Sequence, residues 1–175
     1  MNKKISRKET TQFLSDLLIS DRLTGMGKHY AREVTLGYGL GKGKEKRVDF
    51  IQFCPKNTYS NGGIEKGEFI FYEVKSCKAD LNSGNGLNFD GERNYLVMTM
   101  DTYKECLKDI EKLPYYIGVL ATCPVNRPPG DEFESPTPIT TPNIWWTLKV
   151  AKEAHPHSRE RSMTELLFCM VRSGR

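Results

Sequence analysis

The stretch Phe69-Ile70-Phe71-Tyr72-Glu73-Val74-Lys75 decides the fold. Apolar side chains occupy both faces of its first part, which is typical of a central strand covered on two sides. Side chains alternate across a strand, so Glu73 and Lys75 share one face and Val74 lies on the other. An acid and a base on one face of an apolar strand are costly to bury. The stretch therefore predicts a central strand, residues 68–76, that ends in a polar site.

A second carboxylate lies in an apolar strand just upstream. Asp49 stands inside the expected strand 47–54, although aspartate is depleted in strands and seldom buried alone. If the two strands are neighbours, Asp49 and Glu73 converge, and two carboxylates held together repel unless a cation lies between them. Magnesium suits such a site because it prefers hard oxygen ligands. We expect Mg²⁺, or Mn²⁺, to be held by Asp49, Glu73 and the carbonyl of Val74.

The chemistry that suits this arrangement is phosphodiester hydrolysis. A metal ion in such a site polarises a phosphoryl oxygen and helps to generate hydroxide from water. Lys75 would orient that water or stabilise negative charge on the phosphate. Two alternatives stay open on the residues alone: a plain salt bridge between Glu73 and Lys75 at a sheet edge, or an unrelated α/β protein in which the pattern is accidental.

The rest of the chain predicts a mixed sheet flanked by helices. Phe13, Leu14, Leu17 and Leu18 have helical spacing within a helix expected over residues 5–23. The further expected strands are 30–36, 94–100, 115–122 and 143–150. The further expected helices are one running from a cap at Asp101 or Thr102 to residue 112, and 162–171 with a capping box at Ser162–Glu165 and a stop at Gly174. The segments 37–46, 55–67, 82–91 and 123–142 are expected loops. Early hairpins followed by a strand–helix–strand unit indicate one α/β domain over residues 1–175.

Composition excludes several classes of protein. Hydrophobic residues make up 38% and charged residues 27% of the 175 residues, and no run approaches the length that spans a bilayer. No apolar run follows the basic N-terminus, so we expect no signal peptide. The five cysteines are scattered without a CxxC pair, which argues against a disulfide framework or a structural zinc site. We expect a cytoplasmic protein of a bacterial or phage-infected cell, without a membrane partner.

The charge distribution is compatible with a polyanionic partner. The net charge is +4 and the isoelectric point is about 8.7. Lysine and arginine gather at residues 3–8, 42–47 and 159–175. Each of these segments, taken alone, is better explained as a solvated surface.

The chain also resembles the PD-(D/E)xK nuclease superfamily. The resemblance rests on Arg47-Val48-Asp49 and on Tyr72-Glu73-Val74-Lys75-Ser76-Cys77-Lys78-Ala79-Asp80-Leu81, where Val48 replaces the proline of the superfamily's name. Within it, the chain looks most like the MmcB-like DNA-repair proteins and related phage or mobile-element nucleases. Segments 86–98 and 161–167 look similar too, and the resemblance spans roughly residues 28–172. It implies a restriction-endonuclease-like αβββαβ core, a divalent metal and DNA as the substrate.

Several side chains are secondary candidates for the site. The superfamily often has a fourth acid, and Glu33 could face Asp49 across a hairpin, although an exposed strand residue is an equal alternative. Glu9 is explained as part of a capping box with Ser6. Lys78 and Asn88 are candidate DNA contacts, with a plain surface lysine and a turn residue as their alternatives.

Two further pairs are better explained by structure than by function. His155 and His157 flank Pro156, but no further metal ligand lies near them in the sequence. Trp145 and Trp146 are expected on opposite faces of the last strand, one of them in the core and the other free to pack or to stack on a base.

The function expected from these features is a metal-dependent DNA nuclease acting in repair, recombination or phage biology. The alternative is a catalytically silent nucleic-acid-binding module of the same fold, which would bind mainly through phosphate contacts. Homodimer formation stays open, because cutting two strands often takes two sites. The sequence does not distinguish duplex, branched and single-stranded substrates.

Overall fold

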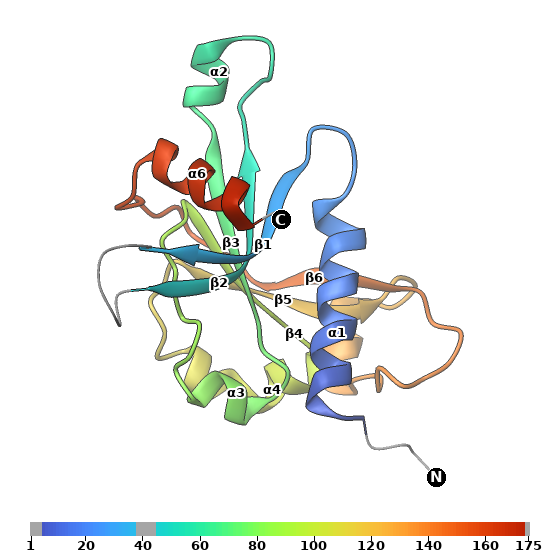
Figure 1. Ribbon diagram of the computed structural model, residues 1–175. Helices are drawn as coiled ribbons and strands as arrows, with labels where there is room; N and C mark the ends of the chain where they lie inside the picture. Colours follow the sequence, from blue (N-terminus) through green and yellow to red (C-terminus); the bar gives the residue numbers. More distant parts are fainter. Residues whose placement is uncertain (1–4, 38–44, 174–175) are drawn as a thin grey trace.

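A six-stranded mixed sheet forms the centre of the molecule, and its strands lie side by side in chain order (Figure 1). The computed structural model describes residues 5–37 and 45–173. The strands are β1 (His29–Leu36), β2 (Lys46–Cys54), β3 (Glu68–Val74), β4 (Arg93–Met98), β5 (Ile117–Pro124) and β6 (Trp146–Lys152). The first three strands are antiparallel, β3, β4 and β5 are parallel, and β6 returns antiparallel to β5. The α/β fold expected from the sequence is confirmed.

Within the described residues, seven helical segments accompany the sheet. They are α1 (Arg7–Leu18), the π-helical turn η1 (Ile19–Leu23), α2 (Asn61–Glu65), α3 (Lys78–Asn82), α4 (Met100–Ile110), α5 (Pro129–Glu134) and α6 (Met163–Ser173). No helix in the described part of the chain has the length and apolar character needed to cross a bilayer.

Helix α1 and η1 cover one face of the sheet. Leu14 and Leu18 are fully buried there, in one cluster with Tyr72 of β3 and Val97 of β4. Burying each leucine contributes about 1.5–3 kcal/mol, which explains why the apolar stripe fixes the helix on the sheet. The helix begins at the predicted capping box. The Glu9 N–H donates to the Ser6 hydroxyl at 3.2 Å, and the Ser6 N–H donates to the Glu9 carboxylate at 2.8 Å.

Two separate clusters cover the opposite face. Helix α6 packs on β1 to β3, where Phe69 and Phe71 are fully buried. Helix α4 packs on β4 and β5, with Leu96 and Met98 beneath it. Because side chains alternate along β3, Glu73 lies on the same face as Phe71, at the border between the two clusters. The end of β3 therefore meets a stretch of sheet that neither helix covers.

Several predicted boundaries were wrong. The N-cap of α4 is Thr99, whose hydroxyl accepts from the Thr102 N–H at 3.1 Å, and not Asp101 or Thr102. Strand β6 begins at Trp146, and the predicted segments 55–67 and 123–142 contain the short helices α2 and α5. Ser162 accepts from the Glu165 N–H at 3.1 Å at the start of α6, as its capping role predicts, whereas Gly174 lies outside the described residues.

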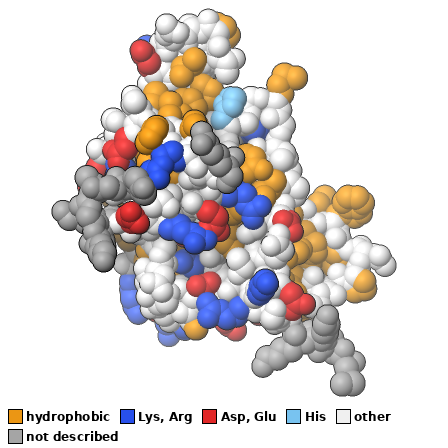
Figure 2. All heavy atoms as spheres, in the orientation of Figure 1, with side chains coloured by type: hydrophobic (Ala, Val, Ile, Leu, Met, Phe, Trp, Pro, Cys, Tyr) orange, Lys and Arg blue, Asp and Glu red, His pale blue; other side chains and the backbone are white. Residues whose placement is uncertain are grey.

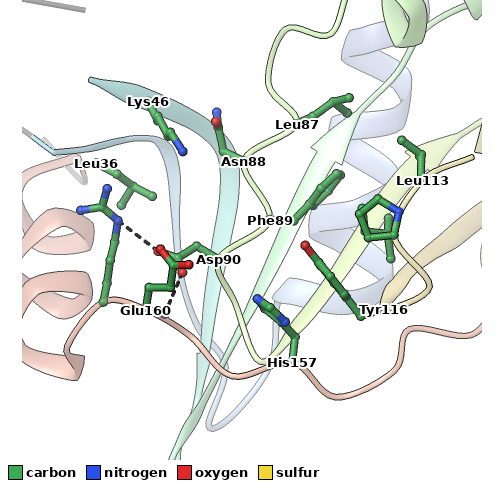
Figure 3. A pocket seen from close by; sticks show the side chains of 13 residues that line it. Leu36, Lys46, Leu87, Asn88, Phe89, Asp90, Leu113, Tyr116, His157 and Glu160 are labelled. Atoms are coloured by element: carbon green, nitrogen blue, oxygen red, sulfur yellow. Dashed lines mark hydrogen bonds and ion pairs between the residues drawn. The ribbon is translucent and has the colours of Figure 1, made fainter. Parts of the chain in front are cut away.

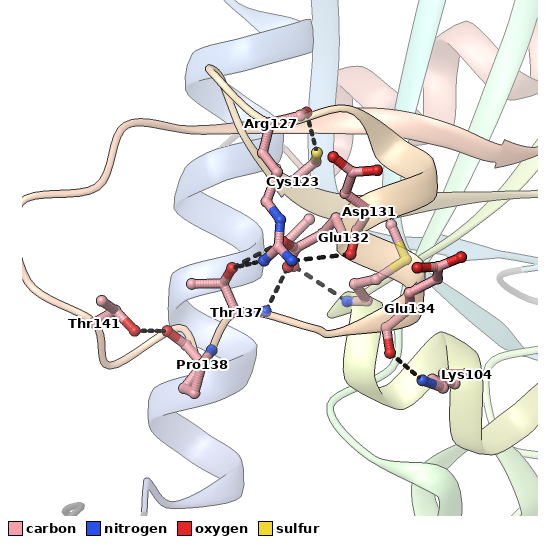
Figure 4. Close-up of polar contacts among 11 residues, drawn as sticks. Lys104, Cys123, Arg127, Asp131, Glu132, Glu134, Thr137, Pro138 and Thr141 are labelled. Carbon is pink, nitrogen blue, oxygen red and sulfur yellow. Dashed lines mark hydrogen bonds and ion pairs between the residues drawn. The ribbon is translucent and has the colours of Figure 1, made fainter.

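The proline-rich segment 124–141 is held by a buried carboxylate (Figure 4). Glu132 has no solvent-exposed surface and pairs with Arg127 at 2.8 Å. It also accepts hydrogen bonds from the backbone N–H of Thr137 at 2.6 Å and from the Thr137 hydroxyl at 2.8 Å. The segment has no periodic pattern of apolar residues, and this network of hydrogen bonds holds it in one conformation instead.

Candidate active site

Asp49 and Glu73 stand opposite each other where the β2–β3 ladder ends. The last paired residues of that ladder are Phe50 and Tyr72, and the next residue along each strand toward the site is an acid. The Asp49 carboxylate turns to β3, and its Oδ2 accepts a hydrogen bond from the backbone N–H of Val74 at 2.8 Å. The convergence of the two acids that the sequence predicted is therefore present.

The Glu73 carboxylate is the most unusual group of the site. Its side chain is only 1% exposed, and its Oε1 atom has no hydrogen-bond partner in the described structure. Burial, reinforced by the neighbouring Asp49 carboxylate, raises the pKa of Glu73 from 4.5 to about 9, although Lys75 opposes this shift. A buried carboxylate with an unpartnered oxygen indicates a place where a cation or a proton is needed.

Lys75 is buried beside the two acids. It is 3% exposed, and its Nζ atom donates to the backbone carbonyl of Asn85 at 2.5 Å. No ion pair joins Lys75 to Glu73 among the residues that the structure describes. The strand that carries both residues is the third of six, so the alternative of a salt bridge on a sheet edge is wrong.

The segment between α3 and β4 closes over the buried pair. Gly86 has a φ of +71°, and a Cβ atom built on it would lie 2.6 Å from Glu73 Oε2 and 3.4 Å from Lys75 Nζ. Only glycine fits this combination of backbone conformation and close approach. The sequence predicted an irregular loop over residues 82–91, but not that this loop packs against the two buried side chains. Its glycine and asparagine content was the only indication of an unusual backbone there.

An open cleft of about 900 Å³ leads to this site. It is lined by residues of α1, β1, β2 and α3, by the end of β3, and by Gly84, Asn85, Gly86 and Asn88. Both basic and acidic side chains line the cleft. They include an Arg7–Asp80 ion pair at 3.2 Å and an Arg47–Glu33 ion pair. Figure 2 shows Lys and Arg side chains interspersed with Asp and Glu on the face of the molecule toward the viewer. A cleft of mixed charge suits a polar substrate held by a few specific contacts.

Asp80 ties helix α1 and the end of β3 together. Its carboxylate accepts from the Ser76 N–H and the Ser76 hydroxyl, both at 3.0 Å, and pairs with Arg7. These contacts fix the chain immediately after Lys75. Ser76 and Asp80 both lie in the stretch that carries the family resemblance, but the hydrogen bonds between them are known only from the structure.

The donor set fits a divalent cation of the magnesium type in part. The two carboxylates and the Val74 carbonyl are hard oxygen donors, and the unpartnered Glu73 oxygen provides a site for positive charge. Among residues 5–37 and 45–173, no three His, Cys, Asp or Glu side chains gather closely enough to hold a metal ion by themselves. The remaining ligands of such an ion would have to be water and substrate oxygens, which is common for magnesium.

The secondary candidates lie at different distances from the site. Glu33 lies on β1 level with Asp49 and lines the cleft, but its backbone is left-handed with a φ of +54° and its carboxylate pairs with Arg47. Asn88 also lines the cleft and donates to the backbone carbonyl of Arg47 at 2.8 Å. Lys78 turns away to α4, where it pairs with Asp109 at 3.4 Å. The structure therefore does not bring Lys78 into the cleft.

The histidines and tryptophans lie away from the cleft. His157 stacks on Tyr116 with a centroid distance of 4.1 Å, whereas His155 lies near Tyr115. Trp146 packs edge-on against Phe13, and Trp145, just before the strand, is 84% exposed. One tryptophan is thus packed on the core, as the sequence predicted.

Comparison with known proteins supports the fold and does not identify a family. No family model matches the chain, and no curated protein matches it. Among solved structures, the chain is similar to the SPO1766 protein of unknown function from Silicibacter pomeroyi. The two share 16% sequence identity with a TM-score of 0.53, over 94% of this chain and 83% of that chain. At this identity the likeness shows that the two chains share an overall fold.

Proposed function

We propose that this protein is a metal-dependent nuclease that hydrolyses phosphodiester bonds in DNA. The observation that carries the proposal is the buried Glu73 carboxylate, with one oxygen unpartnered, between Asp49 and Lys75 at the end of an open polar cleft. This grouping of two acids and a lysine is costly to the folded state unless it serves a charged ligand.

The residues of the chain divide the work among them. Asp49 and Glu73, with the Val74 carbonyl, would hold Mg²⁺ or Mn²⁺, and the bound ion would supply charge for the phosphate and lower the pKa of a water. Asp49 is oriented by its hydrogen bond from the Val74 N–H. The Lys75 side chain is buried beside the two acids, where its Nζ atom donates to the Asn85 carbonyl, and it would stabilise negative charge on the phosphate oxygens.

The order of secondary structure agrees with the family resemblance. The chain order of helix α1, the antiparallel strands β1 to β3, the short helix α3 and the parallel strand β4 supports this proposal, with one additional short helix, α2, between β2 and β3. Asp49 lies on the second strand, and Glu73 and Lys75 lie at the end of the third. A role in repair, recombination or phage biology rests on the resemblance alone.

A panel of DNA substrates tests the proposal. Linear duplex, flap, four-way junction and single strand are incubated with the protein in Mg²⁺ or Mn²⁺, beside Asp49→Ala and Lys75→Ala. We expect the parent to cut at least one substrate and each variant to be slower by roughly 100-fold or more. Lys66→Ala is the matched control, because Lys66 is an exposed lysine two residues before β3.

The outcomes separate the two functions under consideration. Cleavage that survives both site variants would show that another site or a contaminant is responsible. Salt-sensitive DNA binding without any cleavage would instead favour the silent binding module.

A further inference from the structure

A second cavity adjoins the cleft on the other side of the segment that closes the site. It has a volume of about 360 Å³ and shares Lys46 and Asn88 with the cleft. The segment that separates them begins at Asn85, which accepts from Lys75, and continues through Leu87 and Phe89 into the cavity wall. Leu87, the first residue of this segment that lines the cavity, directly follows Gly86, so the cavity begins about 4 Å along the chain from the glycine that packs on Glu73.

The walls of this cavity combine flat aromatic rings with hydrogen-bonding groups (Figure 3). The rings are those of Phe89, Tyr116 and His157, and the last two are stacked with an interplanar angle of 12°. Figure 3 shows Tyr116 and His157 on the side of the cavity away from Lys46 and Asn88. Flat rings beside polar groups are the features with which proteins hold unstacked nucleobases.

Two segments of the chain fix these walls. Asp90 pairs with Arg161 at 3.0 Å and accepts from the Glu160 N–H at 3.0 Å. The backbone N–H of His157 donates to the backbone carbonyl of Glu92 at 2.9 Å. The cavity is therefore held open by defined contacts between residues 87–92 and 157–161, and it is not a gap between loose loops.

We propose that this cavity binds one unpaired base of a single-stranded stretch of DNA whose phosphate lies in the adjoining cleft. This inference rests on the proposed nuclease function and deepens it, because it names the substrate class. A base inside a duplex is stacked on both faces and cannot enter such a cavity without being extruded. Lys46, on the border of cavity and cleft, lies where the backbone of the strand would pass. Single strands, flaps and gaps are accordingly the preferred substrates.

The test measures binding separately from cleavage. A short single-stranded oligonucleotide carrying the fluorescent base 2-aminopurine at one position after another is titrated with the protein in EDTA. We expect quenching at one position above all others, because the base there stacks on an aromatic ring. We expect His157→Ala and Phe89→Ala to remove this quenching and to weaken single-strand binding by roughly 5- to 150-fold. Tyr59→Ala, which removes an exposed aromatic ring elsewhere, is the matched control.

Folding and function are checked independently. Thermal unfolding of both variants shows whether they are folded, and the position-specific quenching of the parent needs no variant at all. Equal quenching at every position, or folded variants that bind like the parent, would overturn the cavity proposal even if the parent cuts DNA. Position-specific binding without cleavage in Mg²⁺ would keep the base site and contradict the nuclease.

Discussion

The Oδ2 atom of Asp49 accepts a hydrogen bond from the backbone N–H of Val74 at 2.8 Å, across two strands whose ladder has ended one residue earlier. The Asp49 side chain thus takes the place of a backbone carbonyl of β2 as the acceptor for the Val74 N–H. The bond holds the Asp49 carboxylate beside Glu73, and burial together with the Asp49 charge raises the pKa of Glu73. The energetic consequences of this arrangement can be measured without a substrate.

Stability should depend on pH through Glu73. In the metal-free protein the pKa of Glu73 is raised above its ordinary value of 4.5, to about 9. Between these values the folded state keeps a proton that the unfolded state releases, so stability falls as pH rises, by at most about 1.4 kcal/mol per pH unit. Urea unfolding in EDTA at several pH values measures this slope. Glu73→Gln should flatten it, and an unchanged slope in that variant would assign the dependence to other groups.

A divalent cation should stabilise the folded protein. Because it would neutralise the two acids, Mg²⁺ or Mn²⁺ should raise the melting temperature, with a gain of about 2.7 kcal/mol at a hundred times the dissociation constant. Asp49→Asn should abolish the rise. Glu68→Gln, at the exposed start of the same strand, should keep it. Equal rises in all three proteins would place the cation outside the proposed site.

Gly86→Ala should impair the site, whereas Gly84→Ala should not. Both glycines have left-handed backbones, with φ of +71° and +69°, so both substitutions carry a backbone strain of about 1 kcal/mol. Only at Gly86 does the new methyl group meet Glu73, at 2.6 Å, and the space around Gly84 is open. Cleavage assays together with thermal unfolding separate the two effects. Equal activity in the two variants would contradict the close packing of segment 84–88 on the acids.

Glu132→Ala should destabilise the fold without touching the site. Removing a fully buried carboxylate leaves Arg127 without its charged partner and the backbone N–H of Thr137 without its acceptor, at a cost of about 3 kcal/mol. Asp131→Ala is the matched control, since the Asp131 side chain is exposed and only its backbone carbonyl contacts Arg127. The difference between the two midpoints in urea measures the contribution of the network.

The sequence alone predicted the mixed sheet and the placement of Asp49, Glu73 and Lys75 on two neighbouring strands. Glu73 and Lys75 alternate with apolar residues along one strand, and Asp49 is a single acid within another apolar strand. The two strands, and the shared face of Glu73 and Lys75, could therefore be predicted from the sequence. Three contacts could not be predicted: Lys75 with the Asn85 carbonyl, Gly86 against Glu73, and Lys78 with Asp109. They depend on how an aperiodic segment folds back in space, for which a single sequence contains no regular signal.

A metal-dependent nuclease site at Glu73 is tested by the rate of DNA cleavage as a function of Mg²⁺ concentration for the parent, Glu73→Gln and Glu68→Gln. Glu73→Gln keeps the size of the side chain and removes only its charge, and Glu68→Gln makes the same change at the other end of β3. We expect the parent and Glu68→Gln to cut with the same dependence on Mg²⁺, and Glu73→Gln to be slower by roughly 100-fold or more at every concentration. Cleavage by Glu73→Gln at the rate of the parent, or cleavage by the parent that persists in EDTA, would contradict a metal-dependent nuclease site at Glu73.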